Sequence, residues 1–126
     1  MLGLHDVTHE EAAPDGAQLV ISKLACSLVG QAQAVEITPD TRTHQAYGRD
    51  VAVELFRCSY GLNPLYREAI GSGPLRVVGV DANREVRIVE LPSHPFYVAT
   101  LFLPQLSSSP EEPHLLILAY LKAAMA

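Results

Sequence analysis

Short apolar runs separated by turn residues follow one another along most of this chain. The alternating run 34–37 ahead of Pro39 and the longer run 51–60 each predict a strand. Apolar residues stand at both odd and even positions of 51–60, which is typical of a strand covered on both faces. The runs 75–80 and 86–91 are joined by four polar or small residues, a pattern that predicts a β-hairpin.

One short helix and one more strand are predicted beyond these runs. Asn63-Pro64 begins a helical segment, and Gly71-Ser72-Gly73-Pro74 ends it. The run 96–102 is almost continuously apolar, so we expect a strand in the middle of a sheet.

The end of the chain predicts a longer helix. Ser109 is the expected N-cap and Pro110 the first helical residue, followed by an apolar body at 115–121. Because this body is apolar on most sides, we expect it to be buried against the sheet or against a partner. The whole pattern predicts an α+β fold with a mostly antiparallel sheet and a C-terminal helix.

Composition narrows the possible classes of protein. The chain has 126 residues, 48% of them hydrophobic and 18% charged, which suits one folded domain over 1–126. A net charge of −5 without a basic run argues against nucleic acid or a membrane as the main partner. No apolar run is long enough to span a membrane, and the first residues do not resemble a signal peptide, so we expect a cytoplasmic protein.

Cysteine and histidine offer little sign of a metal site. Cys26 and Cys58 have no ligand spacing to another Cys or His, and we expect them to be reduced and buried. His5 and His9 form the densest set of possible ligands, but a solvated N-terminal segment is the favoured interpretation. The remaining expectations are that no metal and no cofactor is bound, that 71–74 is too short for a phosphate loop, and that His44 and His114 are exposed.

The chemistry of the segment 93–105 decides the main hypothesis. His94-Pro95 precedes the apolar run, which ends in Leu101-Phe102-Leu103-Pro104-Gln105. This resembles the end of a class I glutamine amidotransferase domain of the CTP synthase type, where the last five residues are Gln-aromatic-His-Pro-Glu. In that family the His and Glu orient and activate a cysteine nucleophile. Leucine cannot accept a proton, so Leu103 and Gln105 imply a domain without the catalytic pair.

The resemblance extends over almost the whole chain and starts at Leu2, after the helix that carries the nucleophile in the family. It implies a partial class I amidotransferase-like (flavodoxin-like) α/β domain, truncated to the C-terminal half. A half domain would leave a sheet edge and an apolar helix face uncovered. We therefore expect a homo-oligomer, a homodimer in the simplest case, or a separate chain that completes the sheet.

A second segment, 54–63, stands where the family has an Arg- and His-rich stretch that holds the carboxylate end of glutamine. Arg57, Tyr60 and Asn63 match its retained positions, while Ser59 replaces the arginine beside the tyrosine. The resemblance implies that Arg57, Tyr60 and Asn63 bind substrate, here a small carboxylated metabolite. Arg57, Tyr60 and His94 could together line an anion pocket.

Three functional hypotheses follow. The first is a catalytically inactive amidotransferase-like protein that acts by small-molecule binding or assembly. The second is a repurposed enzyme with acid-base chemistry in a pocket between subunits, where His94, Tyr60 and Glu90 are the candidate catalytic residues. The third is the C-terminal subunit of a split amidotransferase. We do not expect the chain to hydrolyse glutamine alone.

Overall fold

A five-stranded antiparallel sheet is the centre of the molecule. The computed structural model describes residues 8–9, 19–24 and 28–126. The strands lie in the order β4-β3-β6-β7-β8, and each neighbouring pair is antiparallel. Their bounds are β3 Gln31–Ile37, β4 Val51–Phe56, β6 Arg76–Val80, β7 Val86–Glu90 and β8 Val98–Thr100.

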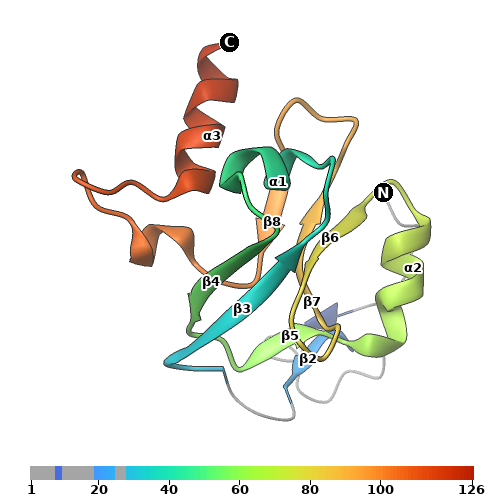
Figure 1. Ribbon diagram of the computed structural model, residues 1–126. Coiled ribbons are helices and arrows are strands. Elements are labelled where there is room, and N and C mark those ends of the chain that lie inside the picture. The colour runs from blue at the N-terminus through green and yellow to red at the C-terminus, as the bar shows by residue number, and fades with distance from the viewer. Residues whose placement is uncertain (1–7, 10–18, 25–27) are drawn as a thin grey trace.

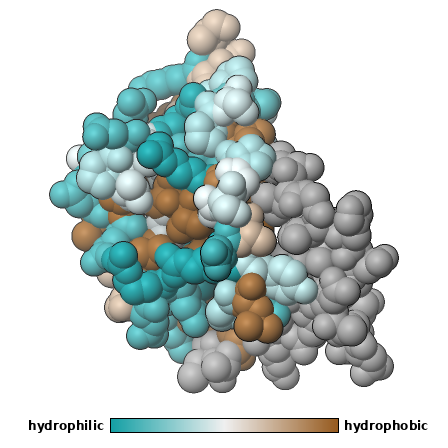
Figure 2. All heavy atoms as spheres, turned by 90° about the vertical axis from the view of Figure 1, so that its right-hand side faces the viewer, coloured by the Kyte–Doolittle hydropathy of each residue, from teal (hydrophilic) through white to brown (hydrophobic). Residues whose placement is uncertain are grey.

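A smaller sheet and several short helices surround it. The small sheet has the order β1-β2-β5, with β1 parallel to β2 and β2 antiparallel to β5. Figure 1 shows α3 and α1 near one end of the large sheet and α2 on the opposite side of the molecule. Figure 2 looks onto the α2 side, which is mostly hydrophilic around a hollow where apolar atoms are visible. The remaining bounds are β1 Thr8–His9, β2 Leu19–Lys23, α1 Arg42–Tyr47, β5 Tyr60–Leu62, the 3-10 helix η1 Pro64–Tyr66, α2 Arg67–Ser72, the 3-10 helix η2 Pro104–Ser107 and α3 Leu115–Met125.

The predicted α+β class with a mostly antiparallel sheet and a C-terminal helix is confirmed. The hairpin of 75–91 is also confirmed as β6 and β7. Its turn is held by Asp81, whose Oδ1 accepts hydrogen bonds from the backbone N–H groups of Asn83 and Glu85, both at 2.9 Å. The short helical segment after Asn63 is present as η1 and α2.

The positions expected for two strands were wrong. The run 51–60 was expected to be covered on both faces, but β4 is an edge of the described sheet, and Val53 is 70% exposed. The run 96–102 was expected to be central, yet β8 has three residues and forms the other edge. An apolar run indicates that its residues favour burial. It does not indicate whether other strands pair with it on both sides.

The start of the last helix also differs from the expectation. Ser109 caps only an isolated turn, because its Oγ accepts from Glu112 N at 3.0 Å. Pro113 disfavours a helical conformation at the residue before it, and α3 begins at Leu115 with His114 as the N-cap. The Nδ1 atom of His114 accepts from Leu116 N at 3.1 Å. His114, expected to be exposed, is only 8% exposed.

A buried carboxylate ties three elements together around this cap. Glu54 of β4 is 6% exposed, and its Oε1 accepts from the Tyr47 hydroxyl of α1 at 2.7 Å. The same oxygen lies 2.7 Å from Nε2 of His114. Because Nδ1 of His114 accepts from the α3 backbone, the ring proton belongs on Nε2, which donates it to Glu54. Together these contacts hold α1 and α3 against β4.

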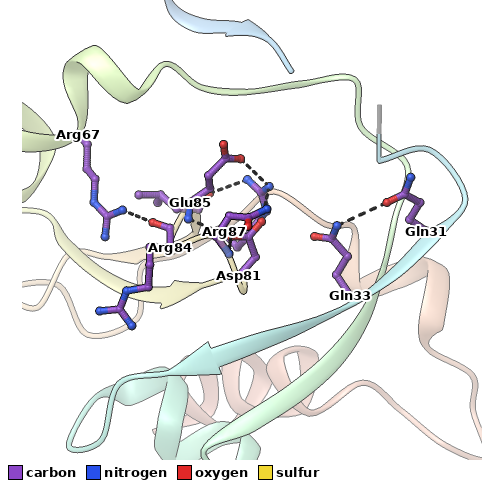
Figure 3. Close-up of polar contacts among 9 residues, drawn as sticks. Gln31, Gln33, Arg67, Asp81, Arg84, Glu85 and Arg87 are labelled. Atoms are coloured by element: carbon purple, nitrogen blue, oxygen red, sulfur yellow. Dashed lines mark hydrogen bonds and ion pairs between the residues drawn. The ribbon is translucent and has the colours of Figure 1, made fainter. Parts of the chain in front are cut away.

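A second buried cluster surrounds Arg87 of β7, as Figure 3 shows. Its Nη2 atom donates to Asp81 Oδ2 at 2.9 Å and to Glu85 Oε2 at 3.0 Å. The guanidinium also lies 5.8 Å from the centre of the Phe56 ring. The positive charge is thus compensated by two carboxylates and an aromatic face.

Removal of Asp81 tests the importance of the Arg87 cluster. We expect Asp81→Ala to lower the free energy of unfolding by about 3–5 kcal/mol, because it leaves a buried guanidinium with one partner fewer and loosens the turn. The matched control is Glu36→Ala, which removes the exposed ion pair of Glu36 with Arg84 (3.4 Å) and is expected to cost about 1 kcal/mol or less. Urea denaturation measures both values. Similar losses in the two variants would contradict the role given to Asp81.

The environment of Tyr47 gives a pH prediction. Burial above all, and then the hydrogen bond and charge of Glu54, raise the pKa of the Tyr47 phenol well above its usual value. The folded state therefore keeps a proton that the unfolded chain releases above about pH 10, so a rise in pH beyond that point favours unfolding. We expect Tyr47→Phe to weaken this alkaline loss of stability, as measured by urea midpoints from about pH 8 to about pH 11. Tyr120→Phe, at a position 54% exposed, is the control and should retain the full loss; equal profiles for the two variants would refute the argument.

Candidate functional site

The segment that carries the resemblance leaves β8 and turns into η2. Phe102 is 1% exposed, whereas Leu103 is 41% exposed and Gln105 is also exposed. Leu103 is the N-cap residue of η2, and its carbonyl accepts from Leu106 N at 3.0 Å. At the position of the family's general base, the surface therefore presents a branched hydrocarbon.

The two segments that resemble the family's active site lie against each other. Gly61 of β5 is buried, and a Cβ atom at this residue would stand 2.7 Å from Leu24 Cδ2 and 3.7 Å from Leu101 Cδ2. Cys58 contributes a second link, because its Sγ donates to the carbonyl of Leu101 at 2.7 Å. A side chain at position 61 would therefore require the Leu24 side chain to shift.

The thiol of Cys58 has no catalytic surroundings in the described part of the chain. Its hydrogen is directed at a backbone carbonyl, and none of the described histidines hydrogen-bonds to it. Cys26 lies outside the described residues. A cysteine nucleophile needs a base or a positive electrostatic environment to form the thiolate, and a carbonyl acceptor provides neither.

The three residues predicted to bind substrate differ in their exposure and in their hydrogen bonds. Arg57 follows β4 and is exposed, and its side chain forms no ion pair or hydrogen bond with another described residue. Tyr60 is half-buried at the start of β5. Asn63 has a structural task, because its Oδ1 accepts from Leu65 N at 3.1 Å and caps η1.

Glu90 and His94 do not form an acid-base pair. Glu90 is 2% exposed and its carboxylate accepts from Thr43 N at 2.6 Å, Thr43 Oγ1 at 2.5 Å and Arg42 N at 3.4 Å. His94 is exposed, and its Nδ1 accepts from Phe96 N at 3.0 Å. The carboxylate therefore caps the start of α1, and the imidazole fixes a turn.

The structure does not bring His94 together with Arg57 and Tyr60. The His94 carbonyl accepts from Arg42 Nη1 at 2.8 Å, which places this turn beside α1. Arg57 follows the far end of β4, and a six-residue strand spans about 20 Å. The anion pocket expected from these three residues is not formed.

The sequence interpretation missed an apolar groove between β8 and α3, which we call the C-terminal groove. Its volume is about 370 Å³. Phe96 and Tyr120 meet across it with ring centres 5.9 Å apart. The apolar body of α3 was the signal that could have found it. The lining residues are Phe96, Tyr97, Val98, Thr100, Pro104, Leu116, Ile117 and Tyr120.

The described residues contain neither a metal site nor a membrane-spanning helix. Among the described residues, no group of three or more His, Cys, Asp or Glu is placed to hold a metal ion. His5 lies outside the described residues, and only the strand position of His9 is described. None of the helices in the described ranges is long and apolar enough to cross a membrane.

Comparison with known proteins gives a consistent result, although no protein-family model matches the chain. CTP synthase of Chloroflexus aggregans is 34% identical over 134 residues, which cover 98% of this chain and 24% of the relative. CTP synthase of Carboxydothermus hydrogenoformans is 33% identical over 133 residues, covering 98% of this chain and 25% of the relative. The chain thus spans about a quarter of the length of these relatives.

A solved structure agrees with the sequence relatives. The glutaminase domain of Trypanosoma brucei CTPS, solved with bound acivicin, superposes with a TM-score of 0.88 at 25% sequence identity. The match covers 99% of this chain and 53% of that chain. Because sequence relatives and fold agree over nearly all of its residues, this chain belongs to the family of glutamine amidotransferase domains of the CTP synthase type.

Proposed function

We propose that this chain is a catalytically inactive amidotransferase-like module that acts by assembly with a second copy of itself. The main support for the loss of catalysis is the identity of residue 103. Leu103 offers no proton acceptor at the position of the family's base. Gln105 replaces the glutamate, and a neutral amide cannot stabilise an imidazolium as a carboxylate does. The thiol of Cys58 is directed at a carbonyl and supplies no substitute nucleophile.

Assembly is supported by the apolar surface along the C-terminal groove. Most of the large hydrophobic side chains exposed on the described residues lie in the last third of the chain. In the described sheet β8 pairs with β7 alone, so its second edge lies beside this groove and is open to another strand. An apolar groove next to a strand edge is a surface that a partner chain commonly covers. Tyr97 and Tyr120 line the groove. The other exposed large hydrophobic residues of the last third are Leu103, Leu106, Leu121 and Met125.

Small-molecule binding stays a prediction at Arg57 and Tyr60. The exposed guanidinium of Arg57, which has no described partner, suits the carboxylate of a small metabolite. The repurposed-enzyme hypothesis has less support, because the carboxylate of Glu90 is occupied by the start of α1.

A glutaminase assay tests the loss of catalysis. We expect no release of ammonia from glutamine above background, either from the chain alone or from mixtures with candidate partner chains. The positive control is the glutaminase domain of Trypanosoma brucei CTPS, assayed in parallel. Ammonia release that depends on this chain would show that another group acts as the base and would overturn the proposal.

Light scattering tests the assembly. We expect a dimeric or larger mass at micromolar concentration, and we expect Tyr120→Glu to weaken self-association about tenfold or more by placing a charge in the C-terminal groove. The matched control is Leu65→Glu, a change of the same kind at a residue that is 87% exposed on η1, away from the groove. It should leave the mass unchanged. A monomeric mass for the unaltered chain at micromolar concentration would contradict the proposed assembly.

A further inference from the structure

A second and larger hollow lies between α2 and β6, and we call it the arginine cleft. Its volume is about 730 Å³, and its lining includes Arg67, Glu68 and Ser72 from α2 and Arg76 from β6. None of these residues belongs to the C-terminal groove or to the segments that resemble the amidotransferase site. We infer that the arginine cleft binds a small phosphorylated metabolite that also carries hydroxyl groups.

The two arginines outnumber the one carboxylate of the lining, that of Glu68, so the cleft carries a net positive charge. Arg76 is exposed, and its side chain forms no ion pair with any described residue. Arg67 donates from Nη1 to the carbonyl of Arg84, as Figure 3 shows, and this contact uses no carboxylate. The chain as a whole carries a net charge of −5, so a cationic cleft is a local departure from the average surface.

The contact with Arg84 also prepares the cleft for a ligand. It ties the Arg67 guanidinium to the turn between β6 and β7 while its other N–H groups stay available. A side chain already fixed by one hydrogen bond loses less conformational entropy when it binds. Arg76 extends from the beginning of β6, so the two guanidinium groups reach the cleft from separate elements.

The donor set favours a phosphoryl group over a carboxylate. Two guanidinium groups and the Ser72 hydroxyl can donate to one ligand from three positions, and a terminal phosphate has three oxygens to accept them. A carboxylate is planar and has two oxygens. The hydroxyl of Ser72 makes only a long bond of 3.3 Å to Ala69 O, which a phosphate oxygen can replace.

The remaining lining residues indicate the rest of the ligand. Glu68 is exposed, and its carboxylate can accept hydrogen bonds from hydroxyl groups of a ligand. Pro64 and Val77 provide apolar contact for a carbon skeleton. A volume of about 730 Å³ leaves room for an organic body beside the phosphate. These properties describe the class of sugar phosphates.

Binding measurements on the whole chain test this inference. Ribose 5-phosphate, inorganic phosphate, ribose and succinate are titrated at constant ionic strength and followed by calorimetry and melting temperature. We expect ribose 5-phosphate to bind more tightly than inorganic phosphate, and ribose to give no saturable signal. Succinate suits the predicted site at Arg57 and Tyr60, so Arg76→Gln should leave any succinate affinity unchanged. Arg76→Gln and Arg67→Gln should each weaken ribose 5-phosphate about tenfold or more, because a hydrogen bond to a charged group is lost.

Arg49→Gln is the matched control, since Arg49 is an exposed arginine between α1 and β4 that does not line the cleft. It should leave the affinity unchanged. Arg76 is exposed at the first position of β6, so its variant keeps the test valid even if Arg67→Gln weakens the fold. Absence of saturable binding of either phosphate, an equal loss of succinate affinity in Arg76→Gln, or an equal loss of ribose 5-phosphate affinity in Arg49→Gln would overturn the assignment.

Discussion

The buried carboxylate of Glu54 is the constraint on which the C-terminal third of the structure depends. A carboxylate that is 6% exposed is costly unless its oxygens are hydrogen-bonded, and here one oxygen accepts from both Tyr47 and His114. His114 then caps α3 with its second ring nitrogen. A single side chain of β4 thus links α1 to the N-terminal cap of α3.

The positions that match the family's motif and those that differ from it lie in different surroundings. Phe102 packs edge-to-face on Phe56 with ring centres 5.6 Å apart and lies 6.3 Å from the ring of His114, while Pro104 begins η2. Leu103 lies between these two residues in the sequence and Gln105 follows them, and both have exposed side chains. Phe102 and Pro104, which match the motif, are the residues that pack in the core or begin η2. Leu103 and Gln105, which differ from it, are the basis of the proposed loss of catalysis.

Local patterns predicted the parts of this fold that depend on neighbours in sequence. The hairpin of β6 and β7 and the helical segment after Asn63 follow from turn residues and period-two alternation. The cap of α3 does not, because the partner of His114 lies 60 residues earlier, in β4. The edge positions of β4 and β8 are equally non-local, since strand order is decided by pairing across the sheet and not by the apolar content of one run. The arginine cleft could not be predicted from local patterns either, because its two guanidinium groups come from separate elements.

The two buried polar clusters are connected through the aromatic core. Arg87 lies over one face of Phe56, Phe56 contacts Phe102, and Phe102 contacts His114, so the hairpin turn and the first turn of α3 are joined by one contiguous layer. One end of this layer lies next to the arginine cleft, because Arg67 contacts the hairpin turn. The other end lies next to the C-terminal groove, which Leu116 of α3 lines. Close-packed rings in single rotamers transmit position and resist deformation. The arginine cleft and the C-terminal groove therefore lie at the two ends of one series of packed ring contacts.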